Sequence, residues 1–260
     1  EIFIKKKFLI YGFGISGKSC FNYLKRKNKV TVFDDFISYK KKIAKLKFDY
    51  IVLSPGIDIK KCSLKKYLFK NRKKIITELD IFNIIYPNNT KITITGTNGK
   101  STTCQMLYKI FKANNLDVRL VGNIGKPPLL EKNINNKTIF IIEASSYQIY
   151  YSRFFKTDHA AILNLSADHL ERHGTINQYA KAKLRLIYSQ NKNDYCYIEK
   201  NNPIINRNIL KKNIKSKLYK LVYNQESFFK KKLNNNYLLD KNNLCNVHFV
   251  YSICKNFKFS

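Results

Sequence analysis

The sequence lacks three features that would each define a class of protein. No apolar run approaches the roughly 18 to 20 residues that span a bilayer as a helix. The six cysteines are dispersed without a C-x-x-C pair, which argues against a zinc site and is typical of a reducing cytosol. No internal repeat is visible. We therefore expect a cytoplasmic globular protein with no membrane-spanning segment.

Acidic residues are also scarce, with 17 Asp and Glu against 49 Lys and Arg, and the formal net charge is +32. Such a charge suggests a nucleic-acid partner, but only 7 of the 49 basic residues are arginine. The lysines are scattered, whereas nucleic-acid readers concentrate arginine and stacking aromatics on one face. Lys, Asn, Ile, Phe and Tyr share AT-rich codons, so genome composition explains the charge equally well. We expect non-specific RNA retention at low salt and no specific nucleic-acid partner; a non-catalytic basic binding protein stays an alternative.

The first motif is a G-x-G-x-x-G turn at Gly12, Gly14 and Gly17. It follows the apolar run 8–11 and precedes a helical pattern, after which a strand-like run ends before Asp34. This order is typical of a dinucleotide fingerprint, in which a pyrophosphate lies at a helix N-terminus and the acidic residue contacts a ribose. A nicotinamide oxidoreductase is therefore one alternative, although it explains only this part of the chain. A carboxylate that caps a turn is the alternative role for Asp34.

Short strands alternate with helical patterns along most of the chain, and this alternation predicts parallel sheets. A polar turn at 86–89 separates two such series. We predict an α/β protein with an N-terminal Rossmann-like parallel-sheet domain at 1–87 and a P-loop ATPase-type α/β central domain at 88–260. The expected strands are 7–11, 29–33, 49–53, 74–76, 91–95, 138–142 and 160–165, and no element is assigned after residue 190.

The second glycine loop, TITGTNGKST at 93–102, carries stronger chemistry. It lies between a strand and a helix, as a phosphate loop does, so that backbone N–H groups surround an anion at the helix N-terminus. In such loops the lysine reaches the terminal phosphates and the serine hydroxyl binds Mg²⁺. Ile94 stands where the general pattern has its first glycine. The expected nucleotide-binding residues are Gly96, Thr97, Asn98, Gly99, Lys100, Ser101 and Thr102.

Ionisable residues follow two later strands of this second series. Glu143 follows the strand 138–142, and Asp168 with His169 follows the strand 160–165. A carboxylate at the C-terminal end of a parallel strand is well placed to bind Mg²⁺ beside a phosphate loop. Lys183 lies on a predicted helix at 179–187. Taken alone, it would be an ordinary surface lysine.

The second loop resembles that of the Mur ligases, the ATP-dependent enzymes that build the peptidoglycan stem peptide. Further matches run in family order across nearly the whole chain: GFGISGKS (12–19), LSPGI (53–57), TELDIF (77–82), VGNIG (121–125), EASSYQ (143–148), NLSADHLERHG (164–174), YAKAKLRL (179–186) and the less regular KNNLCN (241–246). A sister amide ligase, such as another Mur enzyme or folylpolyglutamate synthase, shares the phosphate loop but not EASSYQ together with LSPGI.

The resemblance implies an ATP-dependent amide ligase that joins D-glutamate to UDP-N-acetylmuramoyl-L-alanine through an acyl phosphate. It implies that the first domain holds the UDP end of the sugar nucleotide rather than NAD. It also implies a third domain, which this sequence does not include; a fragment, a split gene and a degenerate copy are the open explanations. We further expect a monomer that binds no membrane.

The resemblance also assigns residues. The catalytic residues would be Lys100, Asn123, His169 and Lys183, and the Mg²⁺ ligands Ser101, Glu143, His169 and Lys183, with Lys183 carbamylated. Asn243 and Asn246 would lie near the adenine. The sugar-peptide substrate would contact Ile15, Ser16, Asp34, Ser54, Pro55, Gly56, Asn123, Ser145, Ser146 and Gln148. His173 is expected to be structural or solvent-exposed, and His159 and His248 carry no functional signal.

Overall fold

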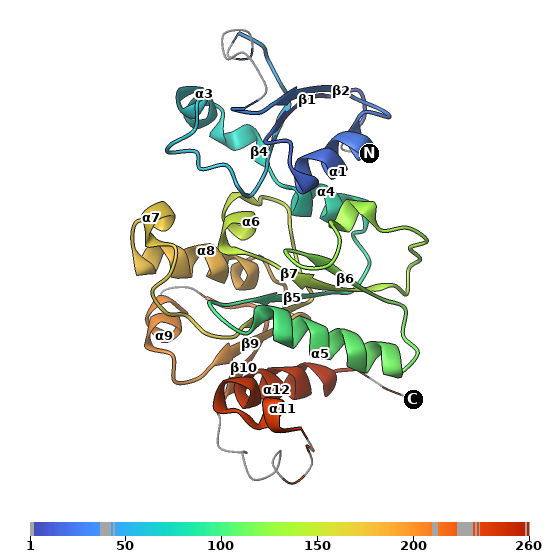
Figure 1. The fold of residues 1–260 in the computed structure, drawn as a ribbon, viewed down its shortest axis with the longest axis vertical. Coiled ribbons are helices and arrows are strands. Elements are labelled where there is room, and N and C mark those ends of the chain that lie inside the picture. Colours follow the sequence, from blue (N-terminus) through green and yellow to red (C-terminus); the bar gives the residue numbers. More distant parts are fainter. Residues whose placement is uncertain are drawn as a thin grey trace. The chain divides into compact units, whose positions relative to one another are not determined.

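The computed structural model describes residues 3–36, 43, 45–209, 213–222, 231, 233, 235–257 and 259. The chain forms two compact units (Figure 1). The first comprises Glu1–Pro87, Pro127–Lys132 and Tyr147–Phe155, and the second comprises Asn88–Lys126, Asn133–Ser146 and Lys156–Ser260. The main division thus falls at the polar turn, while two later segments of the chain return to the first unit.

The first unit is built on a four-stranded sheet in the order β2-β1-β3-β4, with every pairing parallel. Its strands are β1 (Lys7–Tyr11), β2 (Lys29–Phe33), β3 (Tyr50–Leu53) and β4 (Ile75–Ile76). Its helices include α1 (Ile15–Leu24), α3 (Lys65–Lys70), η1 (Arg72–Lys74), α4 (Glu78–Ile85) and η2 (Pro128–Leu130). Alternate residues of β1 enter different clusters: Phe8 and Ile10 pack with α1, and Leu9 and Tyr11 pack with α3. Both faces of the sheet are therefore covered, as parallel sheets require.

Asp80 on α4 ties a distant segment to the first unit. Its buried carboxylate accepts hydrogen bonds from the hydroxyl of Ser152 (3.1 Å) and from the backbone N–H groups of residues 153–155 (2.6–3.0 Å). It also accepts the backbone N–H of Thr77 at 2.7 Å and completes a capping box at the start of α4. One carboxylate thus accepts four hydrogen bonds from the segment after α6 (Ser146–Tyr151) and helps to hold it in this unit.

The second unit is built on a six-stranded sheet in the order β10-β9-β8-β5-β7-β6, again parallel throughout. Its strands are β5 (Lys91–Thr95), β6 (Val118–Gly122), β7 (Ile139–Glu143), β8 (His159–Ile162), β9 (Tyr195–Glu199) and β10 (Lys217–Leu221). The order reverses at β5, which lies between β7 and β8. The C-terminal end of β5 is therefore a topological switch point, the usual ligand position in an open parallel sheet.

Helices cover this sheet on both faces (Figure 1). The helices are α5 (Lys100–Ala113), α7 (Leu170–His173), α8 (Ile176–Tyr188), α9 (Pro203–Ile209), α11 (Asn236–Leu239) and α12 (Lys241–Cys254). Leu107 and Phe111 of α5 and Phe249 and Ile253 of α12 share one core cluster with Ile94 of β5. The two helices therefore cover the same face, while α8 lies on the other. Within the described part of the chain, no helix is long and apolar enough to cross a membrane.

The predicted α/β class with parallel sheets is confirmed, and the element boundaries differ in instructive ways. β7 includes Glu143, which the sequence placed just after the strand, and β8 ends at Ile162, so 163–165 already belongs to the loop. β6, β9 and β10 were not predicted. β10 is an edge strand in which Lys217 and Lys220 are exposed, so its sequence lacks the apolar run of a buried parallel strand.

Candidate active site

The loop between β5 and α5 has a backbone that only glycine allows. Gly99 is the N-cap residue of α5 with φ +81°, and a Cβ atom there would lie 2.3 Å from the side-chain oxygen of Asn246. The side-chain oxygen of Asn164 accepts the N–H groups of Thr97 (3.1 Å) and Asn98 (2.9 Å). These contacts hold the loop in one shape. The first N–H groups of α5, which have no partner within the helix, are left at its N-terminus for an anion.

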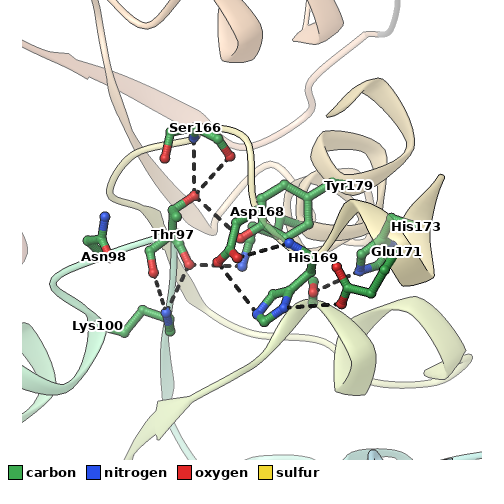
Figure 2. A network of polar contacts seen from close by, with 12 residues as sticks. Thr97, Asn98, Lys100, Ser166, Asp168, His169, Glu171, His173 and Tyr179 are labelled. Atoms are coloured by element: carbon green, nitrogen blue, oxygen red, sulfur yellow. Dashed lines mark hydrogen bonds and ion pairs between the residues drawn. The ribbon is translucent and has the colours of Figure 1, made fainter. Parts of the chain in front are cut away.

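Lys100 lies over this loop. Its ammonium donates hydrogen bonds to the backbone oxygens of Gly96 at 3.1 Å and Thr97 at 2.7 Å. Figure 2 shows its side chain turned toward Thr97. The positive charge is thus held next to the helix N-terminus, where it adds to the attraction for a phosphate.

Glu143, Ser101 and Asn123 form a connected polar cluster. Ser101 at the start of α5 donates from its hydroxyl to Oε2 of Glu143 at 2.7 Å, and the amide of Asn123 donates to Oε1 at 2.8 Å. Glu143 is only 1% exposed and ends β7, while Asn123 directly follows β6. Glu143 at the end of its strand thus lies beside the phosphate loop, where the sequence led us to expect it.

The cluster suits Mg²⁺ in its donor chemistry. Mg²⁺ takes oxygen ligands and is commonly held by one or two carboxylates together with substrate phosphates. Among the described residues, no group of three or more His, Cys, Asp and Glu is arranged to hold a metal by itself. One carboxylate and one hydroxyl beside a phosphate loop therefore fit a cation that arrives with a nucleotide.

Lys183 is buried at the base of the same loop, 2% exposed. Its amine donates to the hydroxyl of Thr95 at 3.1 Å and to the backbone oxygen of Gly96 at 2.9 Å, and it lies 4.7 Å from the ring centroid of Tyr179. Burial, and then the charge of Lys100, lower the pKa of Lys183 to about 7. A substantial fraction is therefore an uncharged amine near neutral pH, unlike an ordinary surface lysine.

Asp168 and His169 lie beside the loop, on the side of Thr97 and Tyr179 (Figure 2). His169 precedes α7 in the left-handed conformation, with φ +53°. Its Nε2 is 3.5 Å from Oδ2 of Asp168, and its Nδ1 is 3.7 Å from Oε1 of Glu171. The His169 side chain is 46% exposed, so it is open to a ligand at the loop.

Some contacts around the loop were not anticipated from the sequence. Tyr179 joins the network through its hydroxyl, 3.4 Å from that of Thr97, and Thr95 contacts Lys183. His173, expected to be structural or exposed, is buried, with Nε2 2.9 Å from the hydroxyl of Ser146. The NLSADHLERHG match contained Asn164 and His173, but their partners lie far away in sequence.

Asn246 and Asn243, which were expected near the adenine, lie on α12. Asn246 is buried against Gly99 of the phosphate loop. Asn243 donates to the backbone oxygen of Tyr237 at 2.8 Å. Asn246 thus borders the phosphate loop directly. A contact of Asn246 with the adenine stays a prediction.

In the first unit, the first glycine loop is equally constrained. Gly12 has φ +90°, and a Cβ on Gly17 would lie 2.0 Å from the backbone oxygen of Gly12. Asp34 accepts the N–H of Phe13 at 2.8 Å, and Ser54 donates to the backbone oxygen of Gly12 at 2.7 Å. Asp34 therefore holds the loop backbone, which is the turn-capping role considered as its alternative.

Six of the remaining residues expected at the sugar nucleotide fall into an exposed pair and a set of four that lines a cavity. Ile15 is 74% exposed at the start of α1, and Gly56 is exposed as well. Four others line one small cavity of the first unit: Ser16, Ser54, Pro55 and Gln148. The structure thus brings these four together, although they come from three separate segments of the sequence.

The second unit therefore has the fold and the loop geometry of phosphate-loop proteins: a glycine loop at a sheet switch point, a lysine over it, and a serine–carboxylate pair beside it. A family model described as the Mur ligase middle domain matches residues 94–256. Because this match covers more than half of the chain, the protein belongs to the Mur ligase family.

Individual relatives agree with this assignment. The chain is 32% identical over 213 residues to the UDP-N-acetylmuramoylalanine–D-glutamate ligase of Rickettsia prowazekii, a match covering 76% of this chain and 47% of that protein. The enzyme of the same name from Elusimicrobium minutum is 40% identical over 182 residues, covering 65% and 39%. The solved structure of UDP-N-acetylmuramate:L-alanyl-gamma-D-glutamyl-meso-diaminopimelate ligase from Neisseria meningitides shares the fold, with TM-score 0.53, 14% identity, and coverage of 83% and 78%. The matched part of the chain spans less than half the length of these two curated relatives.

Proposed function

We propose that this chain holds ATP and a sugar nucleotide for a ligase that joins D-glutamate to UDP-N-acetylmuramoyl-L-alanine in peptidoglycan synthesis. The observation that carries the proposal is the convergence of Lys100, the Ser101–Glu143 pair and the buried Lys183 on one phosphate loop. The choice of substrates is supported by the names of the curated relatives.

The chemistry required is phosphoryl transfer to a carboxylate followed by amide formation. The γ-phosphoryl group of ATP would pass to the free carboxylate of the alanine, forming an acyl phosphate and ADP. The amine of D-glutamate would then attack the acyl carbon, and the tetrahedral intermediate would release phosphate and leave the amide. Such transfers depend mainly on orientation and on stabilising charge.

The loop residues would supply that stabilisation. Lys100 and the N–H groups at the start of α5 would face the β- and γ-phosphates and offset the negative charge that accumulates between two anions. Ser101 and Glu143 would hold Mg²⁺, which neutralises phosphate charge when it is bound. Asn123 hydrogen-bonds Glu143 and would keep its carboxylate oriented.

Lys183 would act after modification by CO₂. An uncharged amine can attack the carbon of CO₂, forming an N–C bond and releasing one proton, and the lowered pKa of Lys183 keeps part of the side chain in that form. The product is an anion, so the nearby charge of Lys100, which opposes an ammonium at position 183, would attract it. A carbamate would also suit a position beside Mg²⁺, with His169 as a further ligand.

The first unit would bind the uridine diphosphate. Its glycine loop leads into the N-terminus of α1, which suits a diphosphate for the same reason that it suits the pyrophosphate of a dinucleotide. Ser16, Ser54, Pro55 and Gln148 would contact the ligand from the cavity that they line. The glycine fingerprint would thus serve a sugar nucleotide and not NAD.

A calorimetric titration of the 260-residue chain tests this proposal, with UDP-N-acetylmuramoyl-L-alanine as ligand and NADH as the comparison. Saturable binding of the sugar nucleotide without binding of NADH is expected. A second titration with ATP and Mg²⁺ should give an independent site. Binding of NADH alone would overturn the proposal and support an oxidoreductase.

A further inference from the structure

Glu78 is a buried carboxylic acid that the proposed mechanism leaves without a role. It belongs to the TELDIF segment, begins α4 and is 6% exposed. Its Oε1 contacts the hydroxyl of Ser19 on α1. The hydroxyl of Ser16 and the backbone N–H of Leu129 also hydrogen-bond to its carboxyl group. Glu78 thus connects α4 to the first turn of α1.

The position of Glu78 relates it to the expected sugar-nucleotide site. It lines the same cavity, about 10 Å³ in volume, as four residues of that site, namely Ser16, Ser54, Pro55 and Gln148. Ser16 lies in the first turn of α1, directly after the glycine loop. The carboxyl group therefore contacts Ser16, a residue of the helix turn at which a diphosphate would bind.

The hydrogen bonds of Ser19 are compatible with a proton on this carboxyl group. The Ser19 hydroxyl contacts Glu78 and also lies 2.9 Å from the backbone oxygen of Ser16. A hydroxyl has a single proton, so it can donate fully to only one of these oxygens. A protonated Glu78 removes the conflict, because Glu78 then donates to Ser19 and Ser19 donates to Ser16.

We propose that Glu78 is a positioning residue of the sugar-nucleotide site, which fixes the first turn of α1 and carries a proton when a diphosphate is bound. This inference rests on the function proposed above for the first unit. A charged carboxylate at this position would repel the diphosphate through a poorly solvated environment, whereas the neutral acid only donates a hydrogen bond. The bound anion therefore favours the protonated form.

The pKa of Glu78 places this coupling between its protonation and diphosphate binding near neutral pH. Burial raises the pKa of Glu78 to about 7, against the opposing effect of the hydrogen bonds that Ser19, Ser16 and Leu129 donate to its charged form. Below that pH, Glu78 is protonated with or without ligand, so affinity is constant. Above it, binding must take up a proton, and affinity falls by at most about tenfold per pH unit.

The other ionisable groups on the described elements packed against Glu78 differ from it in exposure or in hydrogen bonding. On α1, Lys18 and Tyr23 are exposed, while burial and the charge of Glu78 raise the pKa of Cys20 well above its usual value and keep the thiol neutral. On α4 itself, burial raises the pKa of Asp80, but the backbone N–H groups of residues 153–155 donate to its carboxylate and oppose that rise. The segment η2 carries no ionisable side chain.

The test is the affinity of the 260-residue chain for UDP-N-acetylmuramoyl-L-alanine between about pH 6 and pH 8.5, measured by calorimetry. This ligand is preferred to UDP, whose terminal phosphate titrates near pH 6. For the unchanged chain we expect a roughly ten- to thirtyfold loss of affinity over this range. Glu78→Gln should keep the low-pH affinity throughout. Glu131→Gln, which makes the same chemical change after η2, should retain the pH dependence.

A second variant covers the case in which Glu78→Gln does not fold. Ser19→Ala removes a hydrogen bond that lowers the pKa of Glu78, so the fall in affinity should move to higher pH. A purely structural role predicts no such movement. Binding with a flat pH profile, or a fall that persists in Glu78→Gln, would overturn this inference alone. Absence of sugar-nucleotide binding at every pH would overturn the proposed function and this inference with it.

Discussion

Lys18 and Lys100 stand in the same local sequence, Gly-Lys-Ser, yet their surroundings differ. Lys18 is exposed on α1, whereas Lys100 is part-buried over the phosphate loop and donates to two backbone oxygens. The local sequence therefore does not decide how buried such a lysine is or what it contacts. The shape of the loop before it does.

This contrast gives a matched pair of variants. Lys100→Met should weaken ATP binding roughly tenfold or more, because hydrogen bonds to a charged group are lost, and should leave sugar-nucleotide affinity nearly unchanged. Lys18→Met removes the same charge beside the other glycine loop and should leave ATP affinity unchanged. Calorimetric titrations of each variant with ATP and with the sugar nucleotide measure both affinities. Equal loss of both ligands in Lys100→Met would contradict the role assigned to it.

His159 is a buried residue whose surroundings predict an acid-sensitive fold. Its ring stacks on Tyr195 with centroids 4.7 Å apart, and its Nδ1 lies 3.1 Å from the hydroxyl of Tyr197. Burial lowers the pKa of His159 to about 4. The unfolded chain binds a proton near its ordinary pKa of about 6.5, so it holds more protons than the folded chain between these values. The stabilisation is complete above about pH 6.5 and is lost as the pH falls toward 4.

We therefore expect His159→Phe to change the acid response. At pH 7 the variant should be about 1 kcal/mol less stable, because the hydrogen bond to Tyr197 is lost. At pH 5 this difference in unfolding free energy between the two chains should vanish or reverse. The reason is that the unchanged chain loses up to about 1.4 kcal/mol of stability per pH unit in this range. Urea unfolding followed by circular dichroism at both pH values measures this. An equal gap at pH 7 and pH 5 would show that His159 does not titrate as described.

At the scale of elements, the junction of β5, the phosphate loop and α5 depends on α12. Gly99 must be glycine for two separate reasons: its φ of +81° and the Asn246 side chain that fills the space where a Cβ would lie. The contact joins the start of α5 to a helix some 140 residues later in the sequence. Helix α12 thus takes part in shaping the phosphate loop.

Gly99→Ala should cost roughly 2 kcal/mol of stability and weaken ATP binding, because both the backbone and the neighbouring side chain are strained. The double variant Gly99→Ala with Asn246→Ala should recover part of the stability, since it removes the clash but not the backbone strain. Gly14→Ala is the control: Gly14 has φ −72° and no atom within 4 Å of a new Cβ. Thermal unfolding of the three variants separates the effects. No loss of stability in Gly99→Ala would mean that α12 does not constrain the loop.

At the scale of the whole molecule, the net charge of +32 predicts binding to polyanions that depends on no particular site. We expect retention on immobilised RNA at about 50 mM salt and release by roughly 0.3–0.5 M, because counterion release makes such binding steeply salt-dependent. Different RNA sequences should be retained alike, and adding ATP with Mg²⁺ should not release the chain. Retention of one sequence at high salt would contradict this and indicate a specific RNA reader.

Much of the architecture was predictable because its causes are local. A buried parallel strand is a short apolar run, and a glycine loop before a helix has a recognisable order, so β1, β5, β7 and both loops could be located. Strand ends in a parallel sheet meet at one edge, which is why Glu143 could be expected beside the phosphate loop. The edge strand β10, with its exposed lysines, has no such signal.

The sequence by itself thus determined the α/β class, the two glycine loops and the identity of the residues around them, because each depends on neighbours within a few positions. The tertiary structure decided which of those residues are buried and what they contact. The pKa of Lys183 is lowered by its burial and then by the charge of Lys100, more than 80 positions away. Glu78 faces Ser19 across 59 positions, and Asp80 holds a segment more than 70 positions away. Burial and charge–charge distance set these properties, and both exist only once distant segments have packed together.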